Sequence, residues 1–264
     1  MGGMMGDSVS VEIAEGIAIV TLNRPEKGNA MNVALVRELR DCLRRLAEDE
    51  SVDVVVLTGA GRMFCAGQDM RGFSTAEESV EQVALSLEVY DMLQNLPQPT
   101  IAAVNGYAIT GGLELVLSCD LRVAAETALF ADTHARVGLV PGGGASQKLP
   151  RLVGYARAKE MLFTCEFFTA QEALQWGLVN RVVPGDQLLA EARAMAKKIQ
   201  VQDRTAVRRI KRLVNEGWGR DLEAAMRMER LETQRDMLNS RMQDSAKRRD
   251  EVFDRNRGAG APRE

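Results

Sequence analysis

Two short glycine-containing turns constrain the fold of this chain more than any other feature of its sequence. One occupies residues 64–69 (FCAGQD) and the other residues 105–114 (NGYAITGGLE). Each follows an apolar, strand-like run, and its small residues allow a sharp backbone turn. Two such turns can direct backbone N–H groups at one oxygen atom, and preorganised donors of this kind stabilise a developing negative charge. The sequence therefore predicts a site where the two turns converge on an oxyanion.

The order of strand-like and helix-like segments indicates an α/β protein. The compact apolar runs that predict buried strands are residues 17–22, 52–58, 101–105 and 121–125. Leucines at helical spacing predict a helix over residues 33–47, with Asn32 as its cap. A further helix is expected over residues 76–96, ended by two prolines. From residue 188 onward the pattern is almost wholly helical and more charged.

Composition excludes several classes of partner. The chain has 264 residues, of which 45% are hydrophobic, so it can bury a substantial core. A formal charge of −3 and a pI near 5.5 give no overall attraction to nucleic acid or to anionic membranes. No apolar run approaches the roughly 20 residues that span a bilayer, and the first residues do not resemble a signal peptide. We therefore expect a cytoplasmic protein with no nucleic-acid or membrane partner.

The few cysteine and histidine residues do not form metal-binding patterns. The four cysteines are widely separated, at positions 42, 65, 119 and 165, with no paired C-x-x-C spacing. Reduced, packed thiols are the expected state. With a single histidine in the chain, a structural zinc site is not expected either.

A longer set of motifs points to a known family. Besides the two turns, the set comprises residues 17–25 (IAIVTLNRP), 29–32 (NAMN), 55–59 (VVLTG), 137–144 (VGLVPGGG) and 173–179 (ALQWGLV). In order and spacing, the chain resembles the enoyl-CoA hydratase/isomerase (crotonase) superfamily from about residue 10 to residue 255. The resemblance implies a spiral of ββα units with a C-terminal helical region.

The resemblance also implies an organisation along the chain. The expected segments are a flexible N-terminus at 1–9, a spiral core at 10–185, a helical lid and trimerisation region at 186–257, and a flexible tail at 258–264. Members of this family assemble through such helices, so a homotrimer or a dimer of trimers is expected.

By position in the family pattern, the two oxyanion donors are the N–H groups of Gln68 and Gly111. Gly111 is also expected to begin a helix, whose free N–H groups and positive end favour negative charge. Thr110 stands where relatives often carry glycine, which predicts a narrower acyl pocket. The alternative interpretation is that these glycines only form tight turns.

Glu114 lies about one helical turn after Gly111, so its carboxylate can share the face of the oxyanion donor. Partial burial would raise its pKa into the range of a general acid or base. The resemblance assigns it to the first of two catalytic glutamates. The alternative is an acidic residue stabilised by the helix dipole alone.

The position of the second catalytic glutamate holds His134, the only histidine of the chain. An imidazole keeps an acid–base group but changes its reach and charge. Asp132 and Arg136 would share its face if the segment were extended. A purely structural histidine is the alternative, and ordinary hydratase activity is open to question for this reason.

The candidate contacts with an acyl-CoA are Arg24, Ala66, Asp69, Met70, Thr110 and Lys211. For Lys211, the alternative is a solvated face of an amphipathic helix. Neither a metal nor a cofactor is expected, because coenzyme A belongs to the substrate.

Three kinds of function remain open from the sequence. The first is an acyl-CoA enzyme of fatty acid metabolism, most simply one that hydrates a 2-enoyl-CoA through an oxyanion-stabilised enolate. Isomerisation or other enolate chemistry with a single base is the alternative within that class. The second is an acyl-CoA-binding protein that has lost hydration, and the third is a scaffold without a thioester ligand.

Overall fold

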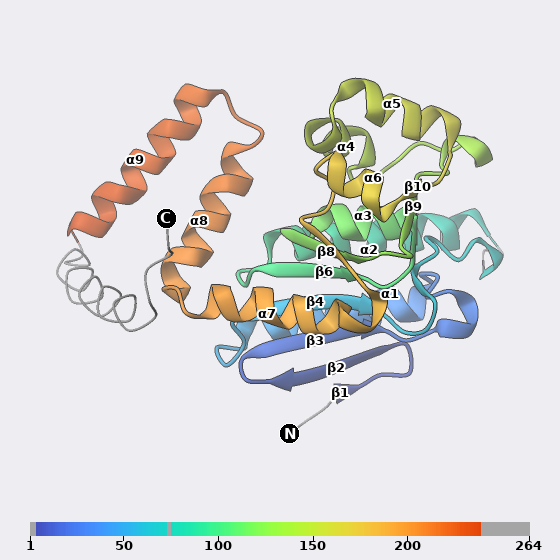
Figure 1. Ribbon diagram of the computed structural model, residues 1–264, viewed down its shortest axis with the longest axis horizontal. Helices are drawn as coiled ribbons and strands as arrows, with labels where there is room; N and C mark the ends of the chain where they lie inside the picture. Colours follow the sequence, from blue (N-terminus) through green and yellow to red (C-terminus); the bar gives the residue numbers. More distant parts are fainter. Residues whose placement is uncertain (1–3, 73–74, 239–264) are drawn as a thin grey trace. The chain divides into compact units, whose positions relative to one another are not determined.

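The computed structural model describes residues 4–72 and 75–238 and divides the chain into two compact units. The larger unit runs to Arg209 and the smaller one begins at Ile210 (Figure 1). The predicted tail at 258–264 lies outside the described residues, as do the first three residues of the predicted N-terminal segment. The predicted division into core and helical lid stays a prediction from the sequence.

The larger unit contains a seven-stranded sheet with the order β1-β2-β3-β4-β6-β8-β11. Its strands are β1 (Met4–Met5), β2 (Val9–Ala14), β3 (Ile17–Leu22), β4 (Val54–Gly59), β6 (Thr100–Val104), β8 (Leu121–Ala125) and β11 (Arg181–Val183). The first three strands pair antiparallel, whereas each pairing from β3 to β11 is parallel. Parallel strands need crossover connections, which brings helices onto the faces of this sheet.

A smaller four-stranded sheet has the order β10-β9-β7-β5. Its strands are β5 (Met63–Cys65), β7 (Tyr107–Ile109), β9 (Leu129–Ala131) and β10 (Phe168–Thr169). Each strand from β4, β6 and β8 continues into a strand of this second sheet, and α2 (Ala76–Asn95) and α3 (Gly111–Ser118) then return the chain. This repetition is the ββα spiral that the sequence resemblance implied, so the predicted fold class is confirmed.

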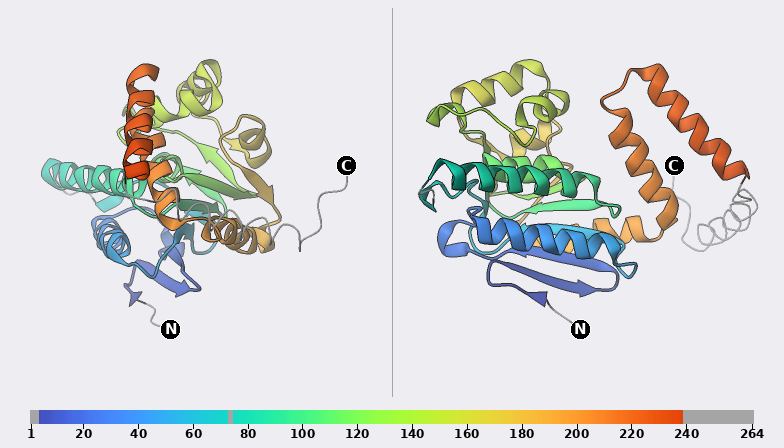
Figure 2. Two further views of the ribbon diagram at one scale, coloured as in Figure 1. Left: turned by 90° about the vertical axis from the view of Figure 1, so that its left-hand side faces the viewer. Right: turned by 180° about the vertical axis from the view of Figure 1, so that it is seen from behind.

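The two faces of the large sheet bury different side chains because successive residues of a strand point to opposite sides. In β3, Ala18, Val20 and Leu22 join the main core with α1 (Val33–Glu48), α2 and α3. Ile17 and Ile19 instead join a second cluster with α7 (Leu188–Gln200). Figure 1 shows α7 along one face, and the view from behind in Figure 2 shows α1 and α2 across the other.

The remaining elements are five helices and four short 3-10 turns in the described residues. The helices are α4 (Ala145–Val153), α5 (Tyr155–Thr164), α6 (Ala170–Gln175), α8 (Arg204–Gly217) and α9 (Leu222–Leu238), and the short 3-10 turns are η1 (Pro25–Lys27), η2 (Met70–Gly72), η3 (Ala135–Val137) and η4 (Gly185–Gln187). In the smaller unit, an ion pair of 2.7 Å joins Arg212 to Glu232. Within residues 4–72 and 75–238, no helix is both long enough and apolar enough for a bilayer crossing.

Local predictions from the sequence hold closely. β3 and β8 have the expected bounds, and α1 begins after Asn32, whose side chain accepts the N–H of Leu35 at 3.0 Å. Helix α2 ends before the two prolines, as expected from their missing N–H and fixed φ. The four cysteines are free and buried, which agrees with reduced, packed thiols.

Candidate active site

The two glycine turns are in direct contact. Gly67 has φ of +92°, and a Cβ added there would lie 2.9 Å from the carbonyl oxygen of Ile109 and 3.3 Å from the nitrogen of Gly111. A side chain would therefore push the turns apart, whereas glycine lets the two backbones meet. The candidate donors Gln68 and Gly111 are thus brought to neighbouring positions.

The neighbouring backbone groups are already hydrogen-bonded, which fixes the turn after β5. Met31 N–H donates to the carbonyl of Gly67 at 2.8 Å, and Asp69 N–H donates to the carbonyl of Met31 at 2.9 Å. In the turns and loops of the part that the structure describes, no carbonyl accepts the N–H of Gln68 or Gly111. Both donors therefore remain available for a ligand oxygen.

Other glycines in the same segments allow equally close contacts. A Cβ at Gly112 would lie 2.2 Å from the carbonyl oxygen of Cys65, and one at Gly106 would lie 2.0 Å from that of Arg62. Real Cβ atoms do not approach backbone oxygen so closely, so the start of α3 can pack on β5 only with glycine.

Helix α2 supports the first turn with a side chain that the sequence interpretation missed. The buried Gln82 amide donates to the carbonyl of Met31 at 2.5 Å and to Oε1 of Gln68 at 2.8 Å. Gln82, Ser86 and Tyr90 follow one another at four-residue spacing, and all three are buried. Polar residues at this spacing were the available signal for an inward-facing polar stripe.

Arg24 also contacts the turn that contains Gly67, through Asp69. Its Nη1 donates to the carbonyl of Ala30 at 2.6 Å and forms an ion pair of 3.2 Å with Asp69. Two of the candidate CoA contacts therefore bind each other in this structure. Ala66 N–H donates to the carbonyl of Gly28 at 2.9 Å, and Met70 is 55% exposed.

Glu114 is buried in the first turn of α3, three residues after Gly111. Its Oε1 accepts the N–H of Gly143 at 2.6 Å and is 3.5 Å from that of Ala145. Burial raises the pKa of Glu114 above its ordinary value, although the charge of His134 and these N–H groups oppose the shift. This pKa direction suits a general base near neutral pH, as predicted.

His134 forms a close pair with Asp132. Its Nδ1 lies 2.9 and 3.0 Å from the two carboxylate oxygens, and its backbone N–H donates to Oδ1 at 3.1 Å. Burial alone would lower the pKa of His134, but the hydrogen bond and charge of Asp132, together with Glu114, raise it above its ordinary value. Because Nδ1 donates to the carboxylate, Nε2 is the ring nitrogen left for a substrate.

The expectation that Arg136 would share this face is not met. His134 has helical dihedrals and precedes η3, so the segment is not extended. Arg136 Nη2 instead donates to the carbonyl of Cys165 at 2.7 Å. The glycine at 138, with φ of +73°, lets the 3-10 turn end at that point.

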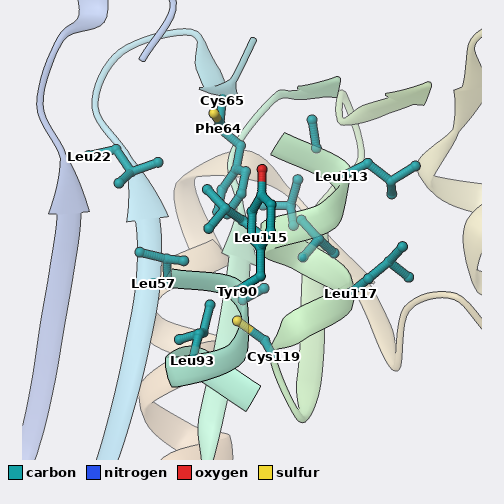
Figure 3. Close-up of a cluster of buried hydrophobic side chains, with 14 of the residues drawn as sticks. Leu22, Leu57, Phe64, Cys65, Tyr90, Leu93, Leu113, Leu115, Leu117 and Cys119 are labelled. Carbon is teal, nitrogen blue, oxygen red and sulfur yellow. The ribbon is translucent and has the colours of Figure 1, made fainter. Parts of the chain in front are cut away.

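Tyr90 is a second buried group that the sequence interpretation missed. Within the described residues its hydroxyl makes no hydrogen bond of ordinary geometry, although the side chain of Gln68 lies close enough to oppose the rise in its pKa. Cβ atoms added to Gly111 and Gly143 would lie 2.7 Å from its oxygen and 2.5 Å from its ring, so the side chain borders both glycines. Figure 3 shows Tyr90 among the leucines of the core, with its hydroxyl at the end nearer Cys65. Burial, with Glu114 and Cys65 nearby, raises the pKa of Tyr90 well above its ordinary value.

Two further predictions concern groups outside this cluster. Lys211 belongs to the smaller unit, so its role in CoA binding stays a prediction. Among the residues that the structure describes, no three His, Cys, Asp or Glu side chains gather as a potential metal site.

Together these groups provide the parts of an enolate-forming site. The turn at Gly67 approaches Gly111, which begins the helix that carries the buried Glu114. The Glu114 carboxylate interacts electrostatically with His134, whose ring pairs with Asp132. Such a site can stabilise negative charge on a carbonyl oxygen and move protons at neighbouring carbons.

Comparison with known proteins supports the same class. A model of the enoyl-CoA hydratase/isomerase family matches residues 12–254. The crotonyl-CoA hydratase of Syntrophomonas wolfei is 38% identical over 229 residues, which cover 86% of this chain and 88% of that protein. The chain therefore belongs to the enoyl-CoA hydratase/isomerase family, and it is an enzyme of that family.

Solved structures of relatives agree in fold. The crystal structure of an enoyl-CoA hydratase from Bacillus anthracis matches with a TM-score of 0.88 and 36% identity, over 93% of this chain and 96% of that one. A monofunctional enoyl-CoA isomerase from M. smegmatis matches with a TM-score of 0.75 and 37% identity, over 84% and 99% of the two chains.

Proposed function

We propose that this chain catalyses the reversible addition of water to a 2-enoyl-CoA. The observation that carries the proposal is the contact between the two glycine turns at Gly67 and Gly111, with the buried Glu114 one helical turn after Gly111. The hydratase names of its relatives, including the crotonyl-CoA hydratase described above, support the same reaction.

In this mechanism, the amides of Gln68 and Gly111 bind the thioester oxygen. Ionised Glu114 removes a proton from water as the water oxygen bonds to Cβ. The π electrons of the Cα–Cβ bond move toward the thioester oxygen, which forms an enolate held by the two N–H groups. Protonated His134 then gives its proton to Cα, and the carbonyl re-forms.

Asp132 makes His134 suitable for the second role. The carboxylate orients the ring and favours its protonated form, so a proton is available near neutral pH. The mechanism converts an ionised Glu114 and a protonated His134 into two neutral groups. It therefore needs no change in the net charge of the site.

Double-bond isomerisation is the second candidate, because it requires only one base that moves a proton between two carbons. The histidine in the second catalytic position and the similarity to the M. smegmatis isomerase favour it. The acyl-CoA-binding protein without turnover that the sequence left open is not supported, because the chain belongs to a family of enzymes. Both remaining reactions use coenzyme A only as part of the ligand.

The test is an assay with crotonyl-CoA and longer 2-enoyl-CoA and 3-enoyl-CoA substrates, followed by absorbance and product mass. Hydration adds the mass of one water, isomerisation leaves the mass unchanged, and a binding protein shows neither. We expect a water adduct that the Glu114→Gln variant does not form. Glu126→Gln, which alters an exposed glutamate outside the site, is the matched control. Isomerisation without any water adduct would contradict the proposal.

Other parts of the function remain predictions from the family resemblance. These are a cytoplasmic location, a place in fatty acid metabolism, and assembly as a homotrimer or dimer of trimers. The CoA contacts at Lys211 and Met70 belong with them.

A further inference from the structure

Thr110 has a backbone conformation that rarely suits a threonine. It precedes Gly111 with φ of 54° and ψ of −109°, in the region of positive φ that glycine adopts freely. A β-branched residue is strained in that region. Strain of this kind persists only where the surrounding contacts hold the residue in place, and it gathers at functional sites.

The contacts that hold Thr110 come from the end of β9 and the residues after it. Its Oγ1 lies 2.6 Å from Oγ1 of Thr133 and accepts the N–H of Thr133 at 3.1 Å. Its own N–H donates to the carbonyl of Ala131 at 2.8 Å. A glycine at position 110 would keep the last of these bonds and lose both bonds to its hydroxyl.

These bonds join the two halves of the candidate site. On one side, Thr110 is followed by Gly111, and its carbonyl accepts the N–H of Glu114 at 3.0 Å. On the other side, Thr133 separates Asp132 from His134, whose side chains pair. The hydroxyl bonds therefore join Thr110, which precedes Gly111, to Thr133, which lies between Asp132 and His134.

We infer that Thr110 and Thr133, here called the threonine pair, position His134 relative to Gly111 and Glu114. In this role both are positioning residues, because they act through His134. The contact of Thr110 with the acyl group is a separate prediction from the sequence. The role in catalysis rests on the proposed function, whereas the effect on His134 does not. The strained threonine supplies a hydroxyl that glycine lacks, which gives a physical reason for its presence.

The single histidine of the chain makes a direct test possible. Its ring signals in an NMR spectrum need no assignment, since His134 is the only source. The titratable groups that act on His134 are Asp132 and Glu114. We expect Thr110→Val and Thr133→Val to lower the midpoint of the His134 titration. Each variant removes a hydroxyl bond that holds the segment of Asp132 and His134, so the Asp132 carboxylate would stabilise the protonated ring less. Thr110→Ser and Thr133→Ser keep the hydroxyl and should retain the wild-type midpoint.

Three further variants serve as controls for this test. Thr110→Gly removes the strain together with the hydroxyl, so it should fold at least as well as Thr110→Val and still lower the midpoint. Thr164→Val removes a hydroxyl from an exposed threonine at the end of α5 and should leave the midpoint unchanged. The double variant Thr110→Val/Thr133→Val should shift the midpoint no further than Thr110→Val alone, because the hydroxyl bond that Thr133→Val breaks is one of the two that Thr110→Val already breaks.

Kinetics supply the second readout. For the proposed reaction, kcat should fall by about tenfold in the two valine variants while KM changes little, as expected for a misplaced catalytic group. The inference is overturned if the His134 midpoint is the same in wild type, Thr110→Val, Thr133→Val and Thr110→Gly. If the wild-type protein converts no enoyl-CoA, the proposed function fails, and the titration still decides the role of the threonine pair.

Discussion

The two halves of the site are built in different ways. The oxyanion half uses backbone N–H groups, and glycines bring the two turns into contact at Gly67 and Gly112. The acid–base half uses side chains, Asp132 and His134, on a short segment that follows β9. In the first half the main chains touch directly, and the side chains of Gln82 and Arg24 add support. The second half is fixed by the Asp132–His134 ion pair and by the hydroxyl bonds of Thr110 and Thr133.

The two halves also differ in how far a change of side chain would disturb the fold. At the backbone half, a single Cβ would displace a strand or a helix. At the side-chain half, a histidine occupies the position where the resemblance implies a glutamate, yet the fold still matches an enoyl-CoA hydratase with a TM-score of 0.88. The match shows that a chain with His134 after β9 keeps the architecture of the family.

The largest expected effect is on the backbone half. Gly112→Ala would place a Cβ 2.2 Å from the carbonyl oxygen of Cys65, which is main chain and cannot turn away. We expect loss of activity and a fall in the free energy of unfolding of about 3 kcal/mol or more, measured by urea denaturation. The control is Gly185→Ala, where the nearest atom would be 4.0 Å away. Equal stability of the two variants would show that α3 does not need this close contact.

Glu114→Gln should separate activity from stability. We expect kcat to fall by about 10²–10⁴, the usual contribution of an acid–base group. Because the folded-state pKa of Glu114 is raised by burial, its ionised form costs stability once the pH exceeds its ordinary pKa of 4.5. The variant should therefore be more stable than wild type at pH 7, and the gain should vanish as the pH falls below that ordinary value. Thermal unfolding across pH measures it, and a variant that is less stable at neutral pH would contradict the burial argument.

The acid–base half should show a smaller effect with a distinct pH signature. His134→Gln should lower kcat for hydration by about 10², the lower end of the usual contribution of an acid–base group. If His134 acts as an acid, activity falls as the pH rises through its pKa, which Asp132 and Glu114 hold above the ordinary value. Asp132→Asn should then move this alkaline loss of activity to lower pH. A pH–rate profile that does not respond to Asp132→Asn would assign His134 a structural role.

The smallest effect is expected at Tyr90, which borders Gly111 and Gly143. Within the described residues the buried hydroxyl of Tyr90 makes no hydrogen bond of ordinary geometry and has only the Gln68 side chain near it, so Tyr90→Phe removes a group that is costly to bury. We expect unchanged stability or a gain of up to about 1 kcal/mol, measured by urea denaturation. Tyr107→Phe, at a half-buried tyrosine that packs on Phe167, is the matched control. A marked loss of stability in Tyr90→Phe would reveal a bond to this hydroxyl.

The sequence predicted the backbone half better than the side-chain half for a physical reason. A glycine after a strand-like run predicts a turn, and Gly111 begins α3 as expected. The contacts of Gln82 and Thr133 join residues that are 14 to 51 positions apart, and no local pattern reveals them. The shared face of Asp132, His134 and Arg136 was predicted only for an extended segment. That condition is not met, because the chain turns into a 3-10 helix after His134.

The central claim is that the amides of Gln68 and Gly111 bind and polarise a thioester carbonyl. Infrared spectroscopy of bound butyryl-CoA, labelled with carbon-13 at the thioester carbon, measures this directly because the saturated ligand does not turn over. The account predicts a carbonyl stretch at lower frequency than that of the same ligand in water. A saturated complex whose carbonyl frequency equals the value in water, or exceeds it, would contradict the account.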